Sequence, residues 1–233
     1  MAELNALAND ENAASMRWFF KTGPGEYGEG DKFIGVKNPA VRSAVKPFRS
    51  MPLEEVSELL ASEIHEYRLA GVVILSEQAK RAARRGELAT QKQLYDFYLG
   101  HTDRINNWDL VDLSCRDVVG LYLLAKQDYR PLYRLAKSKL MWERRIAIVS
   151  TWTLIREGEL MPTFELAEML IDDDHELMHK ATGWMLREAG KRDEVALERF
   201  LKKHADELPR TALRYSIERM SKERRAYWLA YKS

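Results

Sequence analysis

The helical spacing of apolar residues is the feature that most limits what this chain can fold into. Apolar side chains recur every three or four residues along almost the whole sequence, and the alternation typical of strands is nearly absent. Two apolar clusters, at residues 69–75 and 110–124, predict buried helices. We therefore expect an all-α protein without strands.

Signals for helix ends divide the chain into short helices. Asn38 before Pro39 predicts a helix start, because asparagine caps helices and proline is tolerated in the first turn. Helices about 10 to 18 residues long recur as pairs about every 35 to 45 residues, which favours HEAT-like repeats over an irregular helical bundle. The predicted fold is a curved superhelix (α-solenoid) of HEAT-like antiparallel helix pairs, forming a single domain over residues 1–233. Helix stops are predicted at Gly86, Gly100, Gly158 and Gly190.

Composition excludes several classes of protein. No apolar run reaches the roughly 18 residues that cross a bilayer, and residues 1–15 lack the apolar core of a signal peptide, so we expect a cytoplasmic protein. The single cysteine, Cys115, cannot form an internal disulfide or a CxxC site. An amphipathic helix expected at residues 215–229 could cap the last repeat, which favours a monomer.

Charge is unevenly distributed along the sequence. The net charge is only +1, which by itself does not indicate a nucleic-acid partner. A basic cluster formed by Lys80, Arg81, Arg84 and Arg85 could nevertheless give the molecule one basic surface. The same charges could serve solubility alone.

Four residues at repeat-like intervals form the candidate site. Trp108 and Asp112 are four residues apart, so on a helix they project from the same face. Arg145 follows Asp112 by about 33 residues, and Trp184 follows Arg145 by about 39, each close to one repeat. Taken singly, such a tryptophan is usually a core residue and such an aspartate a surface ion-pair partner.

Two cations flank the second tryptophan of this set. Lys180 and Arg187 lie four and three residues from Trp184, so one helical face combines an aromatic ring with positive charge. Cations hold phosphates, rings pack on sugars or bases, and a carboxylate can meet developing positive charge. The set as a whole therefore points to DNA.

Four segments carry a resemblance to a known family: FFKTGPGEYGEGDKFIGV (residues 19–36), NNWDLVD (106–112), WERRIAI (142–148) and KATGWMLRE (180–188). Together they resemble the AlkD-type DNA alkylation repair family, and the likeness spans most of the chain. The last three segments, with WxxxD, an arginine after Trp-x-x, and GWxLRE, are the specific ones.

The resemblance implies a monofunctional DNA glycosylase of base excision repair, built from HEAT-like repeats and needing no cofactor or metal. Its substrate would be double-stranded DNA with cationic N3- or N7-alkylated purines, excised without base flipping. It further implies that Asp112 is the catalytic carboxylate, that Trp108 and Trp184 are aromatic walls, and that Arg145 binds phosphate.

This chain departs from the family at a third aromatic position, which in the family lines the same DNA-binding groove as the two tryptophans. Where the family has an N-terminal tyrosine, Phe19 is aligned here, but Trp18 and Tyr27 are close enough to leave that wall unassigned. The glycine-rich run at residues 23–30 lacks the Lys-Ser/Thr ending of a P-loop and is interpreted as a turn region.

Two other functions compete with this hypothesis. His175, Glu176 and His179 satisfy HExxH, the zinc-binding pattern of metallopeptidases, with Glu194 or Glu198 as a conceivable third ligand. That motif follows three aspartates and so falls in the first turn of a helix, about 180° around it from Trp184. The other alternative is a non-catalytic HEAT-like module that binds DNA structures or a protein partner.

Overall fold

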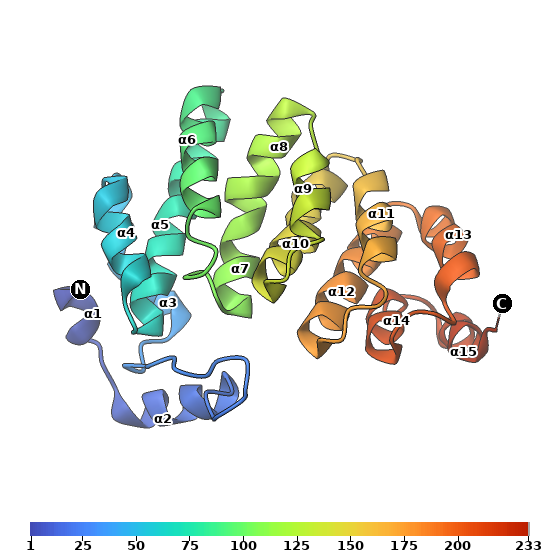
Figure 1. Cartoon of the computed structure of the whole chain (residues 1–233), viewed down its shortest axis with the longest axis horizontal. Helices are drawn as coiled ribbons and strands as arrows, with labels where there is room; N and C mark the ends of the chain where they lie inside the picture. The colour runs from blue at the N-terminus through green and yellow to red at the C-terminus, as the bar shows by residue number, and fades with distance from the viewer. Residues whose placement is uncertain (233) are drawn as a thin grey trace. The chain divides into compact units, whose positions relative to one another are not determined.

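Helices form all the regular structure in the described part of the chain, residues 1–232 of a computed structural model (Figure 1). The one β-type contact there is an isolated bridge between Lys32 and Ile64. The prediction of an all-α protein without strands is confirmed. No helix among these residues is long and apolar enough to cross a membrane.

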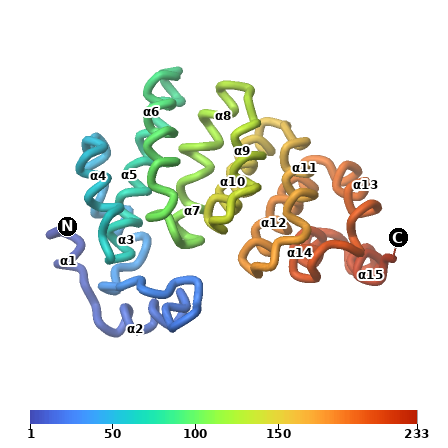
Figure 2. The backbone as a smooth tube through the Cα atoms, viewed as in Figure 1, coloured from blue at the N-terminus to red at the C-terminus, as the bar shows by residue number. Residues whose placement is uncertain are grey.

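The chain packs as two compact units, residues 1–118 and 119–233, whose backbone Figure 2 traces. The helices of the first unit are α1 (Ala2–Asn5), α2 (Asp10–Phe19), α3 (Asn38–Ala44), the 3-10 helix η1 (Lys46–Phe48), α4 (Leu53–Ala61), α5 (His65–Arg84), α6 (Leu88–Leu99) and α7 (Trp108–Cys115). Those of the second unit are α8 (Leu121–Lys126), α9 (Arg130–Leu135), α10 (Met141–Arg156), α11 (Met161–Met169), α12 (Glu176–Arg192), α13 (Glu194–His204), α14 (Arg210–Ser216) and α15 (Lys222–Ala230).

The first unit is built around α5. This helix packs against α3, α4, α6 and α7, with α4 and α6 beside it in Figure 1. Val72, Ile74 and Leu75 on it are fully buried, as the apolar cluster at residues 69–75 predicted. Burial of each such side chain stabilises the fold by roughly 1.5–3 kcal/mol.

The second unit is built around α10 and α12, which pack against each other. The α10 helix also contacts α8, α9 and α11, and α12 also contacts α11, α13 and α14. Successive helices thus pack on one another within each unit, which agrees with an α-solenoid. The curvature of the predicted superhelix and the single domain over residues 1–233 stay predictions.

Three of the four predicted glycine stops are confirmed. Gly86 and Gly158 follow the ends of α5 and α10 with φ of +67° and +90°, a conformation that favours glycine, and Gly100 caps α6. The stop at Gly190 is wrong, because α12 continues to Arg192. A Cβ at Gly190 would lie 2.3 Å from a methyl carbon of Leu197, so this glycine makes room for α13.

A π-helical turn, η2 (Arg116–Gly120), interrupts what the sequence predicts as one helix over residues 110–124. On the α5 side, the Ser76 hydroxyl donates a hydrogen bond to Asp117 in this turn. After the turn Leu123 is buried while Leu121 is only half-buried. The wider turn rotates the apolar stripe, which a pattern of period 3.6 does not anticipate.

The contact between α12 and α14 predicts a specific sensitivity to a single methyl group. A Cβ at Gly183 would lie 2.4 Å from the carbonyl oxygen of Ala212 and 2.6 Å from Cβ of Tyr215, so the helices would have to separate. We expect Gly183→Ala to lower the free energy of unfolding by about 1–3 kcal/mol, despite the better helix propensity of alanine. Urea unfolding measures this loss.

The matched control is Gly71→Ala on α5. There the added Cβ would meet the flexible end of Leu60 at 3.1 Å, so we expect little loss or a small gain in stability. Equal stability of the two variants would contradict close backbone packing at Gly183.

Candidate functional site

The α7 helix begins at the residue pair that the sequence singled out. Asn107 caps it, and its Oδ1 accepts a 2.8 Å hydrogen bond from the backbone N–H of Trp108. Trp108 and Asp112 are four residues apart and so share one face of α7. Both are half-buried. The structure therefore places a ring and a carboxylate together, each partly open to solvent.

The Trp108 ring packs against two phenylalanines at the end of α2. Phe20 stacks on it with 5.5 Å between ring centroids and 18° between planes, and Phe19 meets it edge-on at 6.0 Å. Phe20 is buried, whereas Phe19 is 56% exposed. Phe19 thus extends the exposed aromatic surface of Trp108, and Tyr27 donates a 3.4 Å hydrogen bond to its carbonyl oxygen.

An open hollow of about 900 Å³ adjoins these phenylalanines. Its lining includes Trp18, Phe19 and Phe20 together with Lys37 and Asn38. Trp18 is 84% exposed, which is rare for so large an apolar side chain. Exposed rings beside a cation offer a stacking surface for a sugar or a base.

Behind the start of α7, a buried network joins this helix to α5 and to the preceding irregular segment. The His65 ring lies between two carboxylates, with Nδ1 3.1 Å from Asp31 and Nε2 2.9 Å from Asp109. Arg68 donates to Asp31 at 2.5 Å, and the side-chain amide of Asn107 donates to the same carboxylate at 3.1 Å. All of these residues lie in the first unit.

The two carboxylates keep His65 charged. Burial lowers the pKa of His65, but the charge and hydrogen bond of Asp109 and the hydrogen bond of Asp31 outweigh it, and the pKa rises to about 9. Burial acts in the opposite direction on Asp31 and raises its pKa, but His65 and Arg68 lower it by more. The pKa of Asp31 therefore falls below its ordinary value. At pH 7 both ring nitrogens of His65 therefore donate.

Sequence reasoning missed this network, although a signal was present. His65, Glu66 and Arg68 are ionisable residues directly before the apolar stretch of α5, and each is at most 2% exposed. Buried charges require partners. The Glu66 carboxylate accepts hydrogen bonds of 2.8 to 3.2 Å from the backbone N–H groups of residues 34–36.

Arg145, the predicted phosphate ligand, is buried in the second unit. Only 4% of it is exposed, and its Nη1 donates a hydrogen bond to the carbonyl oxygen of Leu177 in α12. Its neighbour Arg144 is held by Asp173, with 2.6 Å between Nε and Oδ2. A phosphate contact would require Arg145 to exchange its bond to Leu177, and its role in DNA binding stays a prediction.

Trp184 is half-buried on α12, and the two cations predicted beside it have carboxylate partners. Lys180 Nζ lies 2.9 Å from Glu176, and Arg187 pairs with Glu218. The Lys180 side chain is 37% exposed, and so weak a surface ion pair can be exchanged for a phosphate. The Arg187 side chain, at 17%, is held more firmly.

The HExxH histidines take part in the start of α12. His175 is the N-cap residue, and its Nδ1 accepts a 3.1 Å hydrogen bond from the backbone N–H of Leu177. Burial lowers the pKa of His175, which suits a ring nitrogen that accepts. His179 donates through Nε2 to the carbonyl oxygen of Asp173. Within residues 1–232, no group of three or more His, Cys, Asp or Glu side chains is placed to hold a metal ion.

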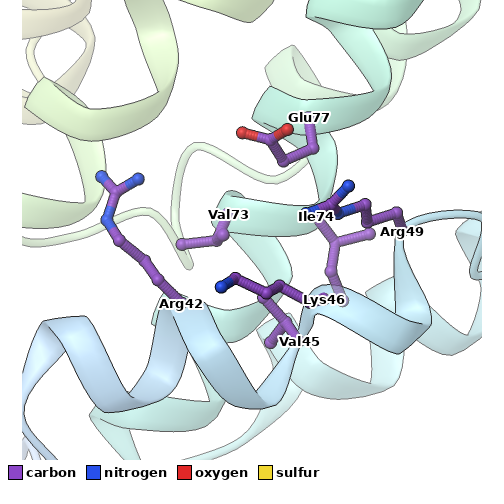
Figure 3. Close-up of a pocket in the computed structure, with 7 residues that line it drawn as sticks. All are labelled: Arg42, Val45, Lys46, Arg49, Val73, Ile74 and Glu77. Carbon is purple, nitrogen blue, oxygen red and sulfur yellow. The ribbon is translucent and has the colours of Figure 1, made fainter.

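A basic pocket lies between α3, η1 and α5 in the first unit. Figure 3 shows Arg42, Lys46 and Arg49 around the side of α5 that carries Glu77, in a cavity of about 180 Å³. The described residues contain no carboxylate within 4.0 Å of these three cations, although Arg42 Nε donates to the Asn38 side chain at 2.8 Å. Sequence reasoning missed this cluster and emphasised Lys80, Arg81, Arg84 and Arg85 instead, of which Lys80 and Arg85 form ion pairs.

Two comparisons with known proteins gave matches, one to a family model and one to a solved structure. A family model described as DNA alkylation repair enzyme matches residues 1–220. Among solved structures the chain is similar to a predicted DNA alkylation repair enzyme from Enterococcus faecalis, with a TM-score of 0.68 and 18% sequence identity. That similarity covers 92% of this chain and 97% of the other, and at such identity it speaks for the fold alone. No curated protein matches the sequence.

The charge of His65 makes stability depend on pH. Its pKa of about 9 in the folded protein exceeds the unfolded value near 6.5, so its contribution is full below pH 6.5 and is lost as pH rises through about 9. We expect the free energy of unfolding to fall across this window by up to about 1.4 kcal/mol per pH unit. Urea unfolding at several pH values measures the slope. A His65→Gln variant with the same slope would contradict this assignment.

Proposed function

The chain belongs to the DNA alkylation repair enzyme family, and from this premise we propose that it is a DNA glycosylase acting on cationic, N3- or N7-alkylated purines in duplex DNA. One observation supports the proposal above the others: a half-buried carboxylate and a half-buried indole share one face of α7. The enzyme would be monofunctional and would act in base excision repair without flipping the base.

The proposed chemistry suits a carboxylate beside an aromatic ring. When the bond between C1′ and the purine nitrogen breaks, its electrons leave with the alkylated base, and the sugar becomes oxocarbenium-like. Asp112 stabilises this positive charge, and the electron-rich face of Trp108 packs against it. Water then attacks C1′ and transfers a proton to Asp112, which leaves free base and an abasic sugar.

The same mechanism restricts the substrate. An alkylated purine that already carries positive charge leaves as a neutral base and needs no general acid. A neutral damaged base would leave as an anion unless it were protonated, and nothing in this mechanism protonates it. Neutral lesions should therefore be poor substrates.

Both units are proposed to contact DNA. In the first, Arg42, Lys46 and Arg49 are held in no ion pair within 4.0 Å among the described residues, although Glu77 lines the same pocket and interacts with Arg49 at longer range, and such cations bind phosphates and release counterions. In the second, we retain Trp184 as an aromatic contact, Lys180 and Arg187 as DNA-binding cations and Arg145 as a phosphate ligand. Lys180 is the most exposed of those three cations.

Replacement of the proposed catalytic carboxylate separates chemistry from binding. We expect Asp112→Asn to lower the single-turnover release of 7-methylguanine from duplex DNA by about 100-fold or more. DNA affinity should be unchanged or higher, because a negative charge near the phosphates is removed. Base release by chromatography and the dissociation constant by fluorescence anisotropy, both in EDTA, measure the two effects.

The matched control is Asp103→Asn, which makes the same charge change at an exposed aspartate nine residues earlier. It should leave excision unchanged. Full activity of Asp112→Asn would remove the mechanism. DNA binding without base release by the wild-type protein would favour the non-catalytic module instead.

The basic pocket can be tested through the salt dependence of binding. We expect replacement of Arg42, Lys46 and Arg49 by glutamine to weaken DNA binding and to make the slope of log K against log salt shallower, by about 0.9 for each phosphate that is no longer bound. A control with three other exposed cations, Lys202, Lys203 and Lys222, replaced by glutamine should keep the slope closer to wild type. Equal slopes in the two triple variants would argue against phosphate contacts in this pocket.

A further inference from the structure

We propose that His65 is a positioning residue for Trp108 and Asp112: by bridging Asp31 and Asp109 it fixes the first turn of α7. His65 itself is buried, with 1% of it exposed, and the proposal rests on the proposed function only in assigning Trp108 and Asp112 to the reaction. The geometry of the bridge is independent of that assignment.

The residues on both sides of Trp108 are tied to this bridge. Asp109, the next residue, accepts from His65 Nε2 at 2.9 Å, and its other oxygen accepts a 2.9 Å hydrogen bond from the backbone N–H of Leu110. Asn107, the preceding residue, caps α7 and donates to Asp31 at 3.1 Å. The start of α7 therefore cannot rotate without breaking a buried contact to this network.

A second route from His65 to Trp108 runs through stacked rings. The imidazole stacks on Phe33, with 4.7 Å between centroids and 24° between planes, and lies 5.0 Å from Phe20. Phe20 in turn stacks on Trp108 at 5.5 Å. The orientation of the indole thus depends on the same histidine as the helix that carries it.

The far side of the bridge is anchored to α5. Arg68 donates to the second oxygen of Asp31 at 2.5 Å and to the carbonyl oxygen of Ser62 at 2.9 Å. His65 and Arg68 are one helical turn apart on α5, so the Asp31 carboxylate is held by two residues of one rigid helix. The position of α7 is therefore fixed relative to α5, the central helix of the first unit.

Protonation makes this arrangement dependent on pH. The charged groups facing His65 are Asp31 from the irregular segment, Asp109 from α7 and Arg68 from α5 itself. An imidazolium donates to both carboxylates, whereas a neutral imidazole has one N–H and must turn a lone pair toward the other. One of the two hydrogen bonds then breaks, and the first turn of α7 loosens.

Small displacements of this turn matter for catalysis. Misplacement of a catalytic group by about 1 Å can cost on the order of 100-fold in rate. The bridge is separate from the basic pocket, so DNA affinity should not follow the loss in rate. This difference separates positioning from general destabilisation.

Two substitutions of His65 test the two hydrogen bonds of the bridge separately. The amide nitrogen of asparagine can take the place of Nδ1, and that of glutamine can take the place of Nε2. We expect His65→Gln, which keeps the hydrogen bond to Asp109, to lower single-turnover excision by less than 10-fold. We expect His65→Asn, which cannot make that hydrogen bond, to lower it by about 100-fold, with DNA dissociation constants within about threefold of wild type.

The pH profile adds a readout that a purely structural role would not move. Wild-type excision, corrected for spontaneous depurination, should fall as pH passes about 9. This fall should be absent in His65→Gln and unchanged in a His204→Asn control. Asp109→Asn, which keeps the shape of the side chain, should lower the midpoint. Two outcomes would overturn the proposal. One is an equal loss of excision rate in the two His65 variants that follows their loss of melting temperature. The other is an unshifted midpoint of the pH profile in Asp109→Asn.

A measurement without catalysis distinguishes this proposal from the proposed function. The indole N–H resonance of Trp108, assigned with Trp108→Phe, should shift as pH passes about 9 in wild type and not in His65→Gln. A shift in a protein that releases no base would support positioning while contradicting the glycosylase. A static resonance in an active glycosylase would overturn positioning alone.

Discussion

The buried charges at the first turn of α5 are the constraint on which the first unit depends. Residues 20–37 contain no helix; turns pair several of their backbone N–H groups within the segment, but those of residues 34–36 need partners outside it. Glu66 supplies them for residues 34–36. Gly35 completes the contact with φ of +83°, and a Cβ there would lie 2.0 Å from the carbonyl oxygen of Asn9, so only glycine fits. A charge that is costly to bury thus orders an otherwise irregular segment.

Contacts made by α5 position the candidate site through a few intervening residues. Once the irregular segment is fixed, Asp31 meets Nδ1 of His65 and Phe33 stacks on the face of its ring. These contacts bring the buried ring of Phe20 against Trp108. An exposed aromatic surface needs such support, because an unsupported ring would turn toward the core instead of toward a ligand. The polar network and the aromatic stack are therefore two parts of one support for α7.

Sequence reasoning predicted what depends on local pattern. Helical periodicity identified the all-α class, and the stops at Gly86, Gly100 and Gly158 followed from the left-handed or terminal positions that glycine favours. It failed at Gly190, where the reason for glycine is close packing of Leu197 from another helix. It missed the bridge at His65 because its partners Asp109 and Asp31 are 44 and 34 residues away in the chain, and no periodicity encodes such a pairing. Arg145 illustrates the same limit, because its burial and its hydrogen bond to Leu177 depend on tertiary packing.

The distribution of charge explains how a nearly neutral protein could act on DNA. With 37 basic and 36 acidic residues, the net charge provides almost no long-range attraction, so the proposed DNA binding relies on cations that are not held in ion pairs. In the described part of the chain, Arg42, Lys46 and Arg49 have no carboxylate within 4.0 Å, although Glu77 lines the same pocket, whereas Lys80 has both Glu77 and Asp117 within 4.0 Å. The acidic residues are not spread at random either: Asp31 and Asp109 are committed to His65 inside the fold. With Arg68, which also pairs with Asp31, this network contains two negative and two positive charges, so it supports α7 without adding net negative charge near Asp112, the proposed catalytic carboxylate.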